Sequence, residues 1–257
     1  MKRSFRHRLF VPVAAALLLT GYATGPLRAD DGANAAAPAD PYGALYDAIQ
    51  GAANPEQSID NAIETLKKAF VSQSPDMAAA EGLYPGLMDR IGGAMRPYML
   101  QHSLNTTALY KPRYIALFKA ELTPDEAARL ATFYRKPAMQ KLLTTMVEHT
   151  DYNAMLGDIG TYDQPAQLSE VTRDVEGATN RSIATMTRSE IEEMSALNKS
   201  DPRLLQKLAA LKPNILKLRT ELENAPMDPK LEADFAAAID KAIDDHFAAG
   251  DAAQPTP

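Results

Sequence analysis

The chain of 257 residues has no cysteine, no tryptophan and only four histidines. Without cysteine, disulfide bonds cannot hold the fold and a lipid anchor on a cysteine thioether is excluded. The three histidines outside the N-terminal segment, His102, His149 and His246, match no metal-ligand spacing such as His-Glu-x-x-His. The sequence also has no Gly-rich phosphate loop, Gly-x-Ser-x-Gly elbow or EF-hand pattern. These absences lead us to expect no catalytic, cofactor or metal site.

The sequence also lacks runs in which β-branched and polar residues alternate, and it has no Asn-Gly turn. Apolar residues instead recur at helical spacing almost throughout. We therefore predict an all-α protein, a single irregular bundle of about eight helices in one domain over residues 42–247. Residues 30–41 and 248–257, rich in Ala, Asp and Pro, are expected to be a disordered leader and a disordered tail.

The first 29 residues have the pattern of a bacterial export signal. A basic segment, 2–8, precedes an apolar run, 9–20, that is too short to span a bilayer, and small residues follow. Cleavage is expected after Ala23, or alternatively after Ala29. The sequence thus predicts a periplasmic or secreted protein with no membrane anchor after cleavage.

Removal of this signal would make the protein strongly acidic. Of the 27 Lys and Arg residues, five lie in residues 1–29, which contain no acid, so 22 remain against 33 Asp and Glu. The resulting net charge of −11 repels phosphate backbones and anionic lipid headgroups, which argues against nucleic-acid and membrane partners.

The strongest local pattern, residues 121–143, predicts two helices joined at a proline. Thr123 can cap the first helix, Glu126 can complete a capping box, and Pro124 suits the first helical position. Pro137 disfavours helical geometry at Lys136, so a second helix should begin there. Two apolar stripes follow, formed by Ala127, Leu130, Phe133 and Tyr134 and then by Met139, Leu142, Leu143, Met146 and Val147.

These residues resemble the signature of a bacterial envelope family, the domain of unknown function two-zero-five-nine. That signature reads Leu-Thr-x-x-Glu, then Phe-Tyr, then a turn similar to Ser-Pro-x-Gly-Gln-Lys. Lys136 replaces the usual Ser, and Met139 replaces the usual Gly, which implies wider packing at this point. The resemblance implies a helical secreted protein and carries over no catalytic or binding residue. The matching positions are Leu122, Thr123, Glu126, Leu130, Phe133, Tyr134, Pro137, Gln140, Lys141 and Leu142.

A similar pattern recurs in residues 186–208, with two residues inserted. It indicates either a degenerate duplication of one helix–proline–helix unit or convergence of two capped amphipathic helices, and both interpretations stay open. The two glutamates could also be imagined as a general acid and base, but capping accounts for both of them. The matched pairs are Thr123 with Thr187, Glu126 with Glu190, Leu130 with Met194, Phe133 with Leu197, Pro137 with Pro202, and Gln140, Lys141 and Leu142 with Gln206, Lys207 and Leu208.

Elsewhere the periodicity predicts further helices around a few helix breakers. Gly92 and Gly93 lie inside one of these helices, where they either admit a close neighbour or mark a bend. Pro213 is expected to kink or split another. The expected segments are helices over 42–53, 55–71, 83–102, 112–122 and 166–186, a loop over 153–165, and a last helix that begins at Asp228 or Pro229.

Aromatic and methionine residues are concentrated between residues 84 and 139. They could line a groove for a peptide or acyl ligand, although filling the core is their commoner use. Our first hypothesis is a non-enzymatic accessory or binding protein of the cell envelope; the second is a carrier or sensor of a small apolar ligand, and a hydrolase ranks last. An exposed apolar patch would favour a protein partner, and a pocket would favour a ligand. The residues are Tyr84, Tyr98, Tyr110, Tyr114, Phe118, Phe133 and Tyr134, with Met88, Met95, Met99 and Met139.

Overall fold

The computed structural model describes residues 40–52, 54–158, 160, 164–195, 197 and 200–253. The expected export signal and residues 30–39 of the expected leader lie outside this range. Every regular element within it is helical, so the all-α prediction is confirmed. The count of about eight helices is not confirmed, because the described residues form more helical segments. These are α2 (Pro41–Gln50), α3 (Pro55–Gln73), α4 (Pro75–Leu83), α5 (Leu87–Glu121), α6 (Pro124–Tyr134), α7 (Pro137–His149), α8 (Asn153–Leu156), α9 (Leu168–Ala184), α10 (Arg188–Met194), α12 (Pro202–Glu223) and α13 (Pro229–Ala253).

Proline and short polar residues fix most of the helix starts. A proline occupies the first turn of α2, α3, α4, α6, α7 and α12, where its missing N–H leaves no hydrogen bond unmade. The side chains of Asn54, Ser74, Thr123, Thr187 and Asp201 each accept a backbone N–H at a helix N-terminus. These local interactions place the helices largely where the sequence predicts them.

The main correction concerns α5, which is one helix of 35 residues although two segments, 83–102 and 112–122, were expected. Its length of about 50 Å makes it the spine of the fold. Pro97 and Pro112 both lie inside it, and each costs about 3 kcal/mol relative to alanine within a helix. Buried residues along its whole length offset that loss, from Leu87 in one core cluster to Phe118 in the other.

The start of α5 at Leu87 also differs from the expected start at residue 83. The carboxylate of Glu81 accepts the N–H groups of Gly86 and Met88, both at 2.8 Å. Gly86 has a φ of 86°, in the left-handed region that favours glycine. A glutamate from the preceding helix therefore caps α5, which residue spacing alone does not reveal.

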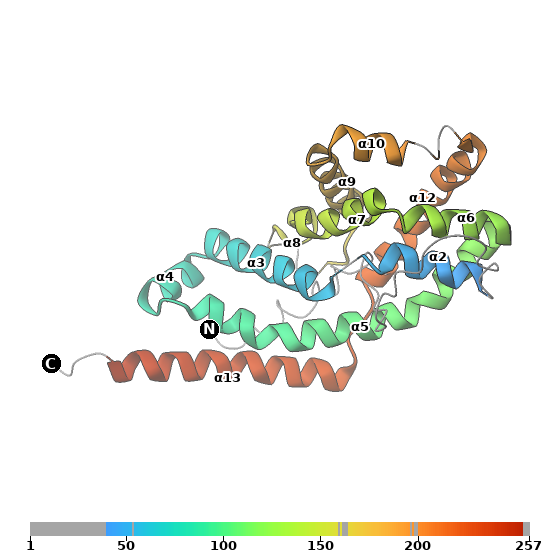
Figure 1. The fold of residues 1–257 in the computed structure, drawn as a ribbon. Coiled ribbons are helices and arrows are strands. Elements are labelled where there is room, and N and C mark those ends of the chain that lie inside the picture. The colour runs from blue at the N-terminus through green and yellow to red at the C-terminus, as the bar shows by residue number, and fades with distance from the viewer. Residues whose placement is uncertain are drawn as a thin grey trace.

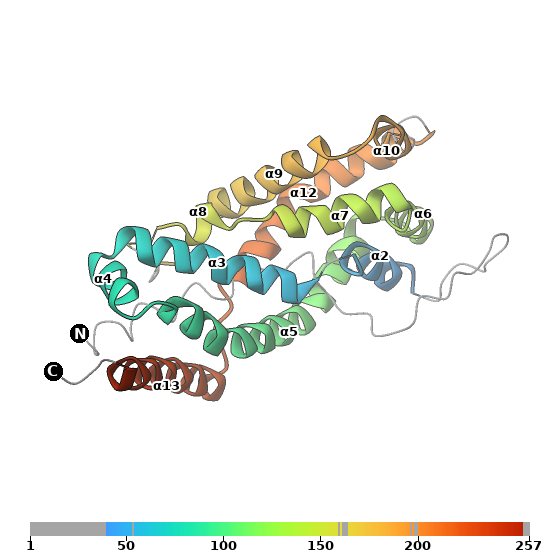
Figure 2. The same cartoon turned by 60° about the vertical axis from the view of Figure 1, so that its left-hand side comes forward.

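The helices form layers in which α5 lies between α13 and the remainder of the bundle. In both views, α13 runs along one side of α5, and α2 and α3 lie on the other side (Figures 1 and 2). Helix α7 lies between this layer and α9, while α12 contacts α9 and continues past α7 to contact α5. One core cluster joins α3, the first half of α5 and α13, and the second joins α2, the second half of α5, α6, α7 and α12.

At Gly92, helix α5 passes close to α3. A Cβ atom at this position would lie 2.8 Å from the Cγ2 atom of Ile63, whereas one at Gly93 would meet nothing within 4 Å. Of the two open interpretations of this pair, close approach of a neighbour therefore applies to Gly92.

The C-terminal helices depart from expectation in two places. Pro213 lies inside α12, which continues from Pro202 to Glu223 and is not split. The last helix runs to Ala253, past residue 247, after which a disordered tail was expected.

The expected loop over 153–165 contains the short helix α8, while residues 159 and 161–163 lie outside the described residues.

Candidate functional site

A partly enclosed cavity of about 260 Å³ lies in the second core cluster. Most of its wall is apolar and comes from the second helix of each motif, α7 and α12. Leu142 and Leu208, which occupy matching positions in the two motifs, both line it. The cavity therefore lies between α7 and α12, the helices with which the two motifs end. The other wall residues of these two helices are Met139, Leu143 and Met146 on α7 and Leu211, Ile215, Leu216 and Arg219 on α12.

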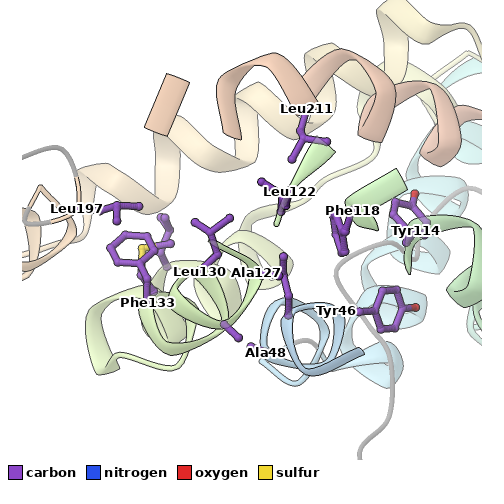
Figure 3. Packing of buried hydrophobic residues seen from close by; sticks show 14 of the residues in the cluster. Tyr46, Ala48, Tyr114, Phe118, Leu122, Ala127, Leu130, Phe133, Leu197 and Leu211 are labelled. Atoms are coloured by element: carbon purple, nitrogen blue, oxygen red, sulfur yellow. The ribbon is translucent and has the colours of Figure 1, made fainter. Parts of the chain in front are cut away.

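Aromatic rings form a second part of the wall. Tyr46 on α2, Tyr114 and Phe118 on α5 and Tyr134 at the end of α6 line the cavity. The rings of Tyr46, Tyr114 and Phe118 lie at one end of the view in Figure 3, and the centroids of the two tyrosine rings are 6.0 Å apart. Burial raises the pKa of Tyr134 to about 12.

The aromatic and methionine set predicted from the sequence divides between two places. Tyr114, Phe118, Tyr134 and Met139 line the cavity, and Met139, expected to widen the packing, lies in its wall. The others lie elsewhere. Tyr84 packs on Phe247 and Tyr98 packs on Phe235, while Tyr110 donates a hydrogen bond to a backbone carbonyl. Phe133 is buried, and the first core cluster contains Met88, Met95 and Met99.

Two of the rings in this wall, those of Tyr46 and Tyr114, carry buried hydroxyl groups. Their side chains are 3% and 4% exposed, and the structure gives neither hydroxyl a hydrogen-bond partner among the described residues. Burial raises the pKa of both phenols, with the nearby carboxylate of Asp47 adding to the effect on Tyr46. Both therefore remain protonated, and each can donate one hydrogen bond. An unmade hydrogen bond of this kind costs about 1–3 kcal/mol.

A buried ion pair lies beside these phenols. The guanidinium of Arg219, which lines the cavity, donates to the carboxylate of Glu223 one helical turn away, at 3.1 Å. The two side chains are 8% and 0% exposed. Burial raises the pKa of Tyr114, and the opposite charges of the pair shift it in opposite directions. No local pattern in the sequence indicated Arg219, Glu223 or Tyr46, because their proximity depends on how α2, α5 and α12 pack.

The capping glutamate of each motif pairs with the lysine of the other motif. Both carboxylate oxygens of Glu126 accept hydrogen bonds from the Lys207 ammonium at 2.8 Å, and those of Glu190 accept hydrogen bonds from Lys141 at 2.7 and 2.9 Å. Each carboxylate also accepts the N–H of its own capping threonine. The hydrogen bond from the lysine, and to a smaller extent the one from the threonine N–H, lower the pKa of both carboxyl groups, and that of Glu190 falls to about 2. Each glutamate thus fixes its own helix start and binds the other motif.

The remaining residues of the predicted motif have structural positions. The Gln140 amide donates to the carbonyls of Tyr134 and Ala48, at 2.6 and 3.0 Å, and so ties α7 to the end of α6 and to α2. Leu130 and Phe133 are buried in the second cluster, and Pro137 begins α7. Leu122, just before the motif, accepts the Tyr42 hydroxyl at 3.0 Å through its carbonyl.

The histidines do not join these residues. His102 is buried on α5, where burial lowers its pKa and a hydrogen bond with the backbone of Ala225 acts in the opposite direction. His246 contacts the carbonyl of Tyr84 at 3.2 Å, and His149 lies in the last turn of α7. Among the described residues, no group of three or more His, Asp or Glu side chains could hold a metal ion. No helix within the described ranges is long and apolar enough to cross a membrane.

Comparison of the chain with protein-family models, curated proteins and solved structures finds no match.

Proposed function

We propose that the protein binds a small, mainly apolar molecule in the cavity between α7 and α12, as a carrier or sensor. The observation that supports this is the composition of the cavity wall, which is apolar and aromatic with a few polar side chains, as is typical of ligand sites. The volume of about 260 Å³ is slightly below the range of roughly 300–1,000 Å³ that is usual for ligand pockets, which favours a small ligand.

An accessory protein that docks on an envelope partner is the alternative, and it has less support. The large hydrophobic side chains exposed within the described ranges are distributed over several helices, and no helix carries more than two of them. They are Val71 on α3, Leu83 on α4, Leu109 on α5, Leu168 and Ile183 on α9, and Ile191 on α10.

A hydrolase ranks last. Glu126 and Glu190, the carboxylates that could act as acid and base, each bind a lysine and a helix N-terminus. With lowered pKa values they remain ionised at neutral pH and hold no proton to donate. Turnover of a generic ester, glycoside or peptide substrate would revive this alternative.

A variant that fills the cavity tests the ligand proposal. Val175 on α9 lines the cavity and is partly buried, whereas Ile183 on the same helix is 39% exposed and does not line it. We expect native mass spectrometry of protein purified from its own host to show a co-bound mass in the wild type and in Ile183→Phe, and its loss in Val175→Phe. Equal occupancy of the two folded variants, or no co-bound mass in the wild type, would contradict the proposal.

Export and family membership are further proposals that rest on the sequence alone. The basic and apolar pattern of residues 1–29 supports export, and the match from Leu122 to Leu142 supports membership of the domain of unknown function two-zero-five-nine. The mature protein should be recovered from the periplasm or medium with an N-terminus directly after Ala23 or Ala29. An intact N-terminus on cytoplasmic protein would reject export.

We also propose that the two helix–proline–helix segments are a degenerate duplication related by a pseudo-two-fold axis. In a two-fold arrangement, residue i of one unit contacts residue j of the other, and j contacts i. The exchanged pairs Glu126–Lys207 and Glu190–Lys141 have this pattern, since both glutamates and both lysines occupy matching positions. In addition, the matched residues Phe133 and Leu197 are both buried in one cluster and lie at the same end of the view in Figure 3.

Superposition in an experimental structure tests the duplication. A rotation of about 180° should place Thr123–Leu142 on Thr187–Leu208 and exchange the two ion pairs. Gln206 is exposed, so it does not reproduce the bonds of Gln140, and this position should superpose least well. Convergence is the better explanation if a rotation that aligns the helix starts leaves the lysines unmatched.

A further inference from the structure

The wall of the cavity is rich in aromatic rings. Four of the 17 residues that line it are aromatic, whereas aromatic residues make up 7% of the whole chain. They are Tyr46 on α2, Tyr114 and Phe118 on α5, and Tyr134 at the end of α6. The centroids of the Tyr46 and Tyr114 rings, 6.0 Å apart, have the usual spacing of an aromatic pair, and the Phe118 ring lies at the same end of the view in Figure 3. The fold thus already gathers aromatic rings in this wall.

Two methionines on α7, Met139 and Met146, add thioether groups to the wall. A thioether sulfur is polarisable and makes favourable contacts with aromatic rings, and the flexible side chain adapts to the shape of its neighbour. The Met146 sulfur already accepts the hydroxyl of Thr179 at 3.8 Å, so Met139 is the better of the two for a test.

We propose that the ligand of this cavity is a small neutral aromatic compound, a single ring with a short apolar substituent. This inference rests on the proposed function of the cavity and goes further by naming the class of ligand. Contacts between two aromatic rings, or between a ring and a thioether, favour binding beyond the burial of apolar area. A saturated ring of the same size gains from burial alone, so the wall should prefer the aromatic one.

The ion pair beside the cavity disfavours a charged ligand. Arg219 is the one charged residue among the described residues that line the cavity, and its guanidinium donates to Glu223 at 3.1 Å. Both side chains are buried, and the pair is neutral as a whole. A ligand carboxylate or ammonium would therefore lose its hydration without gaining a free counter-ion.

The volume of the cavity sets the size of the ligand. An apolar cavity of about 150 Å³, engineered in another protein, binds benzene. At about 260 Å³, the present cavity has room for a benzene ring and a substituent.

Three probes test this inference by titration calorimetry on the purified protein. They are toluene, which is a neutral aromatic ring, methylcyclohexane, which has the same carbon skeleton without the aromatic electrons, and benzoate, which carries a charge. Because methylcyclohexane leaves water more readily than toluene, the quantity to compare is the ratio of their dissociation constants in each variant and in the wild type.

Phe118→Leu removes a ring from the wall, and Met139→Leu removes a sulfur atom at nearly constant volume, so the second variant in particular should fold. Each should weaken toluene relative to methylcyclohexane by about 2- to 10-fold, which corresponds to the loss of one ring–ring or ring–sulfur contact. Phe70→Leu and Met99→Leu are the matched controls, because both residues are buried in the first core cluster and do not line the cavity. They should leave the ratio unchanged.

The outcomes separate the two proposals. An unchanged ratio in both cavity variants, with both neutral probes binding, or an equal change in the controls, would overturn the preference for an aromatic ring and leave the cavity as a ligand site. Benzoate binding more tightly than toluene would overturn the neutral ligand. Failure of both neutral probes to bind the wild type, or equal binding to Val175→Phe, would instead reject the cavity as the site.

Discussion

Gly92→Ala and Gly93→Ala form a pair of substitutions that isolates one packing contact from helix propensity. The two glycines are neighbours inside α5, and alanine gains about 1 kcal/mol of helix propensity at either position. Gly93 is exposed with nothing within 4 Å of a new Cβ atom, so Gly93→Ala should stabilise the protein by about 0.5–1 kcal/mol.

At Gly92 the same methyl group meets the neighbouring helix. The new Cβ atom would lie 2.8 Å from Cγ2 of Ile63, a branched methyl close to the backbone of α3 that cannot swing aside. Overpacking of this kind costs about 1–3 kcal/mol. Since the gain in propensity is shared, Gly92→Ala should be less stable than Gly93→Ala by about 1–3 kcal/mol.

Urea unfolding followed by far-UV circular dichroism measures this difference directly. If the urea dependence of the unfolding free energy is the same in both variants, the difference between their midpoints reports the packing term alone. A third variant, Ile63→Val combined with Gly92→Ala, keeps Cγ2 and should recover little of the loss. A Gly92→Ala protein as stable as Gly93→Ala would show that α3 and α5 do not approach as closely as the structure describes.

Three further predictions concern a buried ion pair, a capping carboxylate and two buried phenols. Glu223→Gln leaves the buried guanidinium of Arg219 without its counter-ion and should cost about 3–5 kcal/mol in chemical unfolding. Glu190→Gln should lower stability at pH 7. Folding lowers the pKa of Glu190 from the ordinary 4.5 to about 2, so the ionised carboxylate stabilises the folded protein. In an acid titration of unfolding, the loss of stability relative to wild type should be complete above pH 4.5 and disappear as the pH falls toward 2. In thermal unfolding without ligand, Tyr110→Phe should lower the free energy of unfolding by about 1 kcal/mol, because it removes a hydrogen bond. Tyr114→Phe should leave that free energy unchanged or raise it. Equal losses in the two variants would argue against an unpartnered Tyr114 hydroxyl.

Helix starts were predictable from sequence because their causes are local. Thr123 and Glu126 form the expected capping box, as do Thr187 and Glu190, and Pro137 begins a new helix. A cap involves a few adjacent residues, so their spacing carries most of the information.

Prolines inside helices were not predictable in the same way. Pro137 ends one helix and begins another, whereas Pro112 and Pro213 lie within continuous helices. The difference comes from burial against neighbouring helices, which offsets the lost hydrogen bond and is absent from local sequence.

The cavity was predictable only in kind. The cluster of aromatic and methionine residues indicated an apolar lining, but core filling and a ligand site use the same residue types. Tyr46 is far from Tyr114 and Arg219 in the chain, and only the packing of α2, α5 and α12 brings the three to one wall.

By itself, the sequence determined the helical class of this protein and the positions of its capped helix starts, since both depend on interactions within a few residues. The tertiary structure alone decided that Glu126 binds Lys207 while Glu190 binds Lys141, and that Tyr46 and Tyr114 line one cavity. These contacts join distant segments, and which of them form depends on how the apolar faces of several helices pack together.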